Sequence, residues 1–152
     1  MPFLNNKKKM NINKFTIKSQ EALQQAQQIA QSFGQQQLEN EHIFKGILEV
    51  DENVTPFILK KLNVNVELFK KVLDSTIQSF PKVSGGDIMF SREAGTTVNE
   101  AEIIAKKMND EYVSIEHLIL AIFKSKSKVA QILKDQSVTE KGLESAISEL
   151  RK

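Results

Sequence analysis

The sequence predicts an all-α protein in which one four-helix repeat occurs twice, the two copies packing as a pseudo-symmetric pair in one globular domain. Apolar residues recur at helical spacing along most of the chain, no segment has a convincing strand pattern, and residue pairs return 75 positions later. The clearest returning pairs are Phe15-Thr16 with Phe90-Ser91 and Glu41-His42 with Glu116-His117. The same offset relates Ala26 to Ala101, Ile29 to Ile104, Ala30 to Ala105, Ile47 to Ile122, Val54 to Val129 and Leu68 to Leu143, with a one-residue slip near Asn63 to Val66. Because such a repeat buries its apolar face against its copy, we expect function at the seam and where the copies differ.

The first helix of each repeat has a serine or threonine at its start and a narrow apolar stripe. Thr16 and Ser91 are the expected N-caps, each worth about 1 kcal/mol. Gly34 is the expected stop of the first copy. The stripes consist of Ala22, Leu23, Ala26, Ile29, Ala30 and Phe33, and of Val98, Ala101, Ile104, Ala105 and Met108. Alanine at the closest positions predicts that these two helices pack tightly at the centre.

Three further helices are expected in each repeat. The second runs over about 40–50, and its copy starts after Ser114. The third begins with Thr55 as N-cap and Pro56 at the first helical position, and its copy covers about 127–135. The fourth uses Leu68, Phe69, Val72, Leu73, Ile77 and Phe80, and its copy starts at Thr139 and uses Leu143, Ile147 and Leu150.

These helices divide the chain into a first repeat at 11–80 and a second at 90–152, joined by a linker at 81–89. The linker contains Pro81-Lys-Val-Ser-Gly-Gly86, a run that favours neither helix nor strand. Residues 1–10 are expected to be a disordered tail or an alternative start. The final residues, 149–152, lack a capping signal, as if more chain followed.

Composition excludes several classes of function. The chain has no cysteine, so disulfides and thiolate chemistry are excluded, and a reducing cytoplasm is expected. No apolar run approaches the about 18 residues that cross a membrane. The net charge is +2, but it becomes −1 without the three lysines Lys7, Lys8 and Lys9. A nearly neutral domain with one tyrosine and no tryptophan disfavours nucleic-acid binding.

The sequence has no motif of a nucleotide-hydrolysing or metal-dependent enzyme. It lacks both Gly-x-x-x-x-Gly-Lys-Ser/Thr and Gly-x-Gly-x-x-Gly, so this chain is not expected to be an enzyme or to bind a nucleotide cofactor. His42 and His117 are the only histidines, and neither has the spacing of a zinc-binding helix. We expect them to pack and hydrogen-bond locally, with no metal bound.

Glu41 and Glu116 each fall in the first turn of a helix, where two roles are open. A carboxylate there stabilises the helix dipole by about 0.3–1 kcal/mol, which is a sufficient structural reason for its presence. Alternatively, each could pair with a cationic group of a ligand at the seam between repeats. Asp110-Glu111-Tyr112, just before the later helix, adds negative charge to that rim.

Three segments resemble the N-terminal domain of the ClpB family, bacterial AAA+ disaggregases of the Clp/Hsp100 class. They are Lys14-Phe-Thr-Ile-Lys-Ser-Gln-Glu-Ala-Leu23, the linker Pro81–Gly86, and Asp110-Glu-Tyr-Val-Ser-Ile-Glu-His-Leu118. The resemblance covers almost the whole chain. It implies a double repeat tethered to a homohexameric, two-ring ATPase that binds ATP and magnesium in domains downstream. It also implies cytoplasmic stress-response work alongside a DnaK-type cochaperone system.

In that family the N-terminal domain engages apolar segments of unfolded or aggregated proteins and passes them to the ring. The resemblance implies that Thr16, Asp110 and Glu116 take part, with an apolar groove that includes Val98 and, where some relatives have an apolar residue, His117. In the related ClpC family the glutamates matching Glu41 and Glu116 are associated with phosphorylated arginine, so Glu41 is a possible secondary ligand site.

Several interpretations remain open from the sequence. Val98, Ala101 and Ile119 could supply exposed apolar surface for substrates, although Ala101 fits the core better. Thr16 could cap its helix, contribute to the site, or do both. The leading function is recruitment of unfolded protein, and the main alternative is docking of an adaptor or cochaperone, as is common for ClpA and ClpC.

Overall fold

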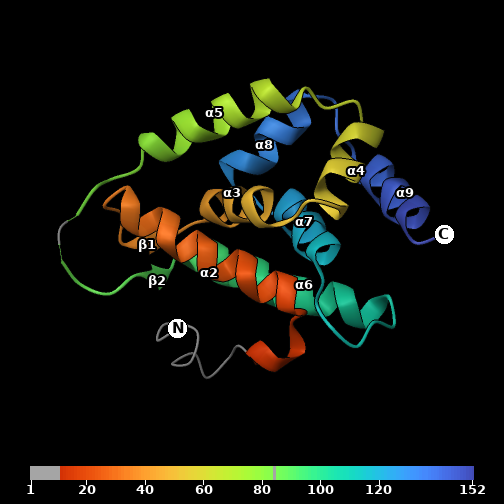
Figure 1. Cartoon of the computed structure of the whole chain (residues 1–152), viewed down its shortest axis with the longest axis horizontal. Coiled ribbons are helices and arrows are strands. Elements are labelled where there is room, and N and C mark those ends of the chain that lie inside the picture. The colour runs from red at the N-terminus through yellow and green to blue at the C-terminus, as the bar shows by residue number, and fades with distance from the viewer. Residues whose placement is uncertain (1–10, 84) are drawn as a thin grey trace.

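The computed structural model describes residues 11–83 and 85–152, and the chain there is almost entirely helical (Figure 1). The all-α prediction is confirmed, and the expected tail at 1–10 lies outside the described residues. The elements are η1 (Ile12–Lys14), α2 (Ile17–Ser32), β1 (Gln37–Leu38), α3 (Asn40–Val50), α4 (Val54–Lys61), α5 (Val66–Gln78), β2 (Met89–Phe90), α6 (Arg92–Lys107), α7 (Ile115–Lys124), α8 (Lys128–Asp135) and α9 (Glu140–Leu150).

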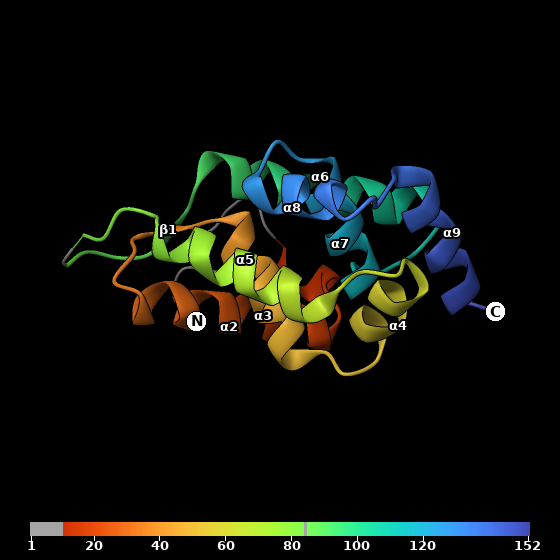
Figure 2. The same ribbon diagram turned by 90° about the horizontal axis from the view of Figure 1, so that it is seen from above.

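The two repeats, α2–α5 and α6–α9, contact each other in a reciprocal way. The third helix of each packs on the fourth helix of the other, α4 on α9 and α8 on α5. Seen from above, α2, α3 and α4 lie on one side and α6 and α8 on the other, with α7 between them and α9 at the right-hand end beside α4 (Figure 2). Two short parallel pairings also connect the repeats: β1 pairs with β2, and Phe15 forms a bridge with Val113. These pairings, which the sequence did not predict, join the start of each repeat to the other repeat.

The offset between the repeats changes once and does not return to its first value. It is 75 through the second helix, where Ile47 and Ile122 are both buried, and 74 from the third helix onward. The N-caps Asn65 and Thr139 show the shorter offset. Leu143 therefore corresponds to the buried Phe69, and the predicted pairing of Leu68 with Leu143 is wrong, since Leu68 is 49% exposed. Val129 likewise corresponds to Thr55 and not to Val54.

Side chains at the helix starts fix where most helices begin. Thr16 and Ser91 each accept a backbone N–H as N-caps, as expected, and Ser127 and Thr139 cap α8 and α9 in the same way. The predicted start of the third helix is wrong, because α4 begins at Val54 and Thr55 lies inside its first turn. Asp51 takes the capping role instead and accepts N–H groups from Asn53, Val54 and Thr55.

The core is one continuous cluster shared by both repeats. Ala22, Ala26 and Ala101 are fully buried in it, as the tight central packing of α2 and α6 required. At the crossing of α2 and α3, a Cβ on Gly46 would lie 2.5 Å from the backbone oxygen of Ala22, so only glycine fits. Within the described residues, no helix is long and apolar enough to cross a membrane.

Candidate functional site

The candidate site is built around the start of α7, where His117 fixes the geometry. Its Nδ1 accepts the backbone N–H of Ser114 at 2.8 Å, so the neutral ring carries its proton on Nε2. Nε2 then donates to Asp110 Oδ2 at 2.7 Å. The histidine thus closes a capping box at the helix start and holds the Asp110 carboxylate in place. Local hydrogen bonding is the role that the sequence predicted for it.

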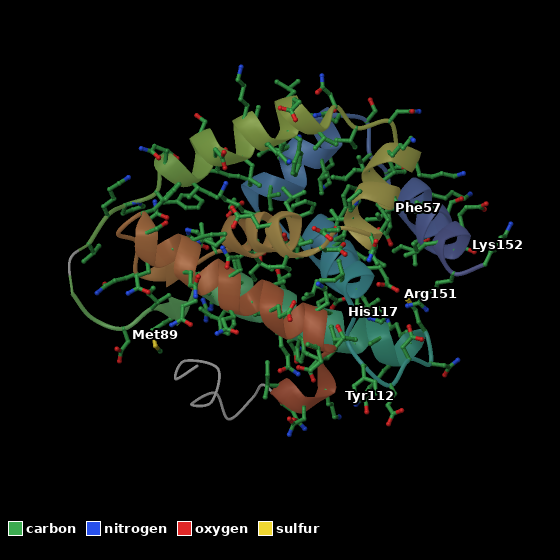
Figure 3. All side chains as sticks on the ribbon, viewed as in Figure 1. Phe57, Met89, Tyr112, His117, Arg151 and Lys152 are labelled. Carbon is green, nitrogen blue, oxygen red and sulfur yellow. The ribbon has the colours of Figure 1, made fainter. Side chains whose placement is uncertain are left out.

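Arg151, just after α9, brings Asp110 and Glu116 together. Its Nε and Nη2 donate to Glu116 Oε2 at 3.1 and 2.8 Å. Nη2 also lies 2.9 Å from Asp110 Oδ2 and 3.4 Å from His117 Nε2. Figure 3 shows Arg151 and His117 next to each other in the region between α9, α7 and α6. One guanidinium therefore serves two carboxylates, and the group keeps one excess negative charge.

The ionisation of this group is set by its contacts. Burial disfavours the charged form of Asp110, but hydrogen bonds from Arg151 and His117 outweigh it and lower the pKa of the carboxyl below its ordinary value. The Arg151 side chain is still 33% exposed. Water screens an ion pair at such a position, so each ion pair of Arg151 contributes only about 0–1 kcal/mol to the free energy of unfolding. Asp110 is thus held in its charged form, and Arg151 is the most exposed of the three side chains in the group.

The equivalent positions in the first repeat hold a neutral group. His42 repeats the capping box by accepting the backbone N–H of Glu39, but its Nε2 faces Gln35 Oε1 at 2.7 Å where His117 faces Asp110. Gln35 in turn donates to the backbone oxygen of Ile77, the residue equivalent to Arg151. Burial lowers the pKa of His42 from 6.5 to about 4. This group contains no cation.

The two first-turn glutamates also differ. Glu41 is buried and crosses to the other repeat, where its Oε2 accepts the backbone N–H of Val129 at 2.8 Å, in the first turn of α8. Burial raises the pKa of Glu41, against this hydrogen bond. The corresponding N–H in the first repeat belongs to Thr55 and is already bonded to Asp51. Glu116 therefore bonds Arg151 instead, and Glu41 has an internal partner where a ligand was considered.

A groove of about 670 Å³ adjoins the Arg151 group, between α6, α7 and α9. Its floor is apolar, with Ile104, Leu120 and Ile147 only 5%, 5% and 3% exposed, and its rim carries three basic side chains and one acid. The lining residues are Ile104, Lys107, Met108, Leu120, Lys124, Glu144, Ile147, Ser148 and Arg151. Arg151 thus belongs to the groove as well as to the acidic group.

The corresponding place in the first repeat is nearly closed, with a cavity of about 140 Å³ between α3 and α5. Lys45, at the position of Leu120, lies 2.7 Å from Asp74, which stands at the position of Ser148. This ion pair joins the two helices across the cavity. Leucine and serine cannot form such a pair, so the second repeat keeps its groove open.

The structure brings only some of the predicted site residues together. Asp110, Glu116 and His117 meet at Arg151, as described. Thr16 caps α2, and its N–H bonds Val113, which ties it to the segment leading into α7 but gives it no contact with the acids among those described. Val98 and Ile119 are 4% and 1% exposed, so the expectation that they form exposed apolar surface is wrong, and both belong to the core with Ala101.

Sequence reasoning missed Arg151 and the groove floor. The offset of 75 aligns Arg151 with Thr76, a solvent-facing position, and only the offset of 74 aligns it with the buried Ile77. Ile104, Met108 and Ile147 were predicted only as members of apolar helix stripes, because periodicity does not show that the neighbouring helix leaves one side uncovered. In the part of the chain that the structure describes, no cluster of three or more metal-binding side chains is found.

Comparison with known proteins gives a consistent picture. Residues 14–136 match the model of the Clp repeat (R) N-terminal domain. The chain is 51% identical over 143 residues to a ClpB chaperone of Bacteroides thetaiotaomicron, covering 94% of this chain and 17% of that protein. It is 43% identical to a ClpB chaperone of Porphyromonas gingivalis, with the same coverage. The chain therefore spans about a sixth of the length of these relatives.

Solved structures share the fold at lower sequence identity. The Hsp104 N-terminal domain from Candida albicans superposes with a TM-score of 0.79 at 19% identity, covering 90% of this chain and 91% of that one. A ClpV N-domain in complex with a VipB peptide gives 0.76 at 16% identity, covering 91% and 88%. At these identities the likeness concerns the fold alone.

Proposed function

Since this chain belongs to the Clp repeat N-terminal domain family and matches the N-terminal region of ClpB chaperones, we propose that it recruits unfolded protein through the groove of its second repeat. The occupant is an apolar segment of an unfolded or aggregated chain, carrying a basic residue beside its apolar ones. The domain is not itself an enzyme and carries out no covalent chemistry. It binds the segment and passes it to the ATPase ring.

The shape of the groove supports this proposal. Its volume of about 670 Å³ lies within the roughly 300–1,000 Å³ of ordinary ligand sites. Met108 on the floor is unbranched and adapts to different shapes, as a site for many sequences requires. At the Arg151 end of the groove, Asp110 and Glu116 can pair with a lysine or arginine that flanks the apolar residues, whereas the rest of the rim is mainly basic.

The observation that carries the proposal is the difference between the repeats. The first repeat has a cavity of about 140 Å³ between α3 and α5, and the second has a groove of about 670 Å³ between α6, α7 and α9. A protein that needed only stability would gain by burying apolar side chains equally in both places. An open apolar groove in one copy, beside a charged group absent from the other, is typical of a binding site.

In the longer protein, we expect the domain to act beside a homohexameric AAA+ ring that hydrolyses ATP with magnesium. Affinity at one groove is low, and six copies around a ring raise it through effective concentration. We also propose that the protein acts in the cytoplasm together with a DnaK-type cochaperone system.

The test is an amide chemical-shift titration of the chain with an unfolded casein. We expect shifts along 104–108, 120–124 and 144–151, which line the groove, and none along 45–49 and 70–74, which line the closed cavity of the first repeat. Equal shifts in both regions, or none at millimolar casein, would contradict the proposal. A tight complex of fixed stoichiometry with a folded partner, without casein binding, would favour adaptor docking.

A further inference from the structure

The Asp110–Glu116 pair already holds a guanidinium, and that guanidinium comes from the protein itself. Arg151 approaches Glu116 Oε2 through two of its nitrogens and reaches Asp110 with one of them. Donation through Nε and Nη2 together requires the planar fork of arginine, which a lysine ammonium does not have. The two carboxylates thus form a cradle with the geometry for a guanidinium.

The cradle is held more firmly than its occupant. Asp110 is fixed by His117, whose ring is fixed by the Ser114 N–H. Glu116 lies in the first turn of α7 and is only 10% exposed. Arg151, by contrast, follows the last turn of α9 and its side chain is 33% exposed. Its removal would leave Asp110, still held by His117, beside the nearly buried Glu116 carboxylate without a cation, so an incoming cation finds a prepared place.

Arg151 also lines the groove, so a segment lying there meets it directly. From these observations we propose that Arg151 is a built-in competitor: it occupies the position that an arginine of the bound segment takes between Asp110 and Glu116. The inference rests on the proposed function and refines it. The preferred segment carries arginine next to apolar residues, and exchange with Arg151 sets its affinity.

Replacing Arg151 by an arginine of the bound segment costs little free energy, and the site selects arginine over lysine and citrulline. An arginine from the segment restores the hydrogen bonds that Arg151 gives up, so the charge-assisted bonds are replaced and not lost. Lysine offers a point charge without the fork, and citrulline offers the same shape without charge. We therefore expect binding to fall in the order arginine, lysine, citrulline.

The experiment compares three peptides of one apolar sequence that differ only in carrying arginine, lysine or citrulline at a single position. Binding to the 152-residue chain is measured by fluorescence anisotropy, for the unmodified protein and for Arg151→Met. Methionine keeps the apolar stem on the groove wall and removes the guanidinium. The matched control is Lys152→Met, which removes the neighbouring charge and leaves the cradle intact, since Lys152 pairs with Glu149.

Removal of the competitor should tighten the arginine peptide by about threefold to tenfold, because the cradle is then always free. The citrulline peptide should bind both proteins equally, and Lys152→Met should leave all three affinities unchanged. Weaker or unchanged binding of the arginine peptide to Arg151→Met would overturn the inference while leaving the groove intact. Failure of all three peptides to bind either protein would overturn the proposed function as well.

A second measurement needs no variant. Ethylguanidinium titrated into the unmodified chain should move the Arg151 Nε–H signal toward that of free arginine and shift the amides of Glu116 and His117. Ethylammonium at the same concentration should produce smaller shifts. Equal effects of the two ions would show general screening and overturn the exchange.

Discussion

The two repeats share helices, caps and core, yet they differ at the positions that face their outer grooves. In the first repeat, Lys45 and Asp74 join α3 to α5, and Ile77 is fully buried. In the second repeat, the same positions hold Leu120, Ser148 and Arg151, and the groove stays open. The shared residues build the scaffold, and a few substitutions in one copy make the site. The comparison teaches that the function of a duplicated fold lies where equivalent positions differ.

The largest expected difference between the repeats concerns the histidines, and it is a difference in how the free energy of unfolding depends on pH. His42 is neutral and buried beside Gln35, and its pKa is lowered to about 4. Because the unfolded chain binds the proton more readily, this contribution to stability is present above pH 6.5 and is lost as the pH falls toward 4. Relative to His42→Gln, the unmodified protein should lose about 3 kcal/mol over that window.

Denaturant unfolding at several pH values, with an imidazole NMR titration of His42, measures this effect. Gln35→Asp would give His42 the partner that His117 has, and it should raise the midpoint because a carboxylate favours the imidazolium. A titration midpoint of His42 near pH 6.5 in the unmodified protein would contradict its description as a neutral, buried side chain.

The glutamates give a smaller test. Glu41→Ala leaves the buried N–H of Val129 without its acceptor, which should cost about 1–3 kcal/mol of unfolding free energy. Glu116→Ala removes a partly exposed ion pair and should cost less than about 1 kcal/mol. Casein binding should respond in the opposite way, weakening for Glu116→Ala and not for Glu41→Ala. If Glu116→Ala were the more destabilising of the two, Glu116 would be a structural residue and its assignment to a ligand site would be wrong.

The helical fold could be predicted from the sequence because the signals for a helix come from residues that are close together in the chain. The periodic stripes, the Ser and Thr caps and the returning Glu-His pairs all predicted elements that the structure contains. The α4 start was mispredicted because Asp51, three residues before Val54, outcompetes Thr55 as a cap by accepting several N–H groups at once. That competition depends on the turn geometry and not on residue type alone.

The site was only partly predictable. Asp110, Glu116 and His117 were found, but Arg151 was not, because the change of offset from 75 to 74 hides its equivalence to Ile77. Val98 and Ile119 were considered as possible exposed surface, yet they are buried. Whether an apolar stripe faces a neighbour or an open groove depends on small differences in packing, such as the Lys45–Asp74 pair, that periodicity does not encode.

The most direct measurement exchanges the closing pair between the repeats. Leu120→Lys with Ser148→Asp should close the second groove and weaken casein binding by about tenfold or more, since the ion pair occupies the place of the apolar segment. The reverse exchange, Lys45→Leu with Asp74→Ser, keeps the second groove and serves as the matched control, in which the shifts at 104–108 and 120–124 persist. The account predicts lost binding in the first double variant while its amide spectrum stays that of a folded protein, although a lysine at the place of the buried Leu120 lowers the thermal midpoint. Full casein binding by a folded Leu120→Lys/Ser148→Asp protein would contradict it.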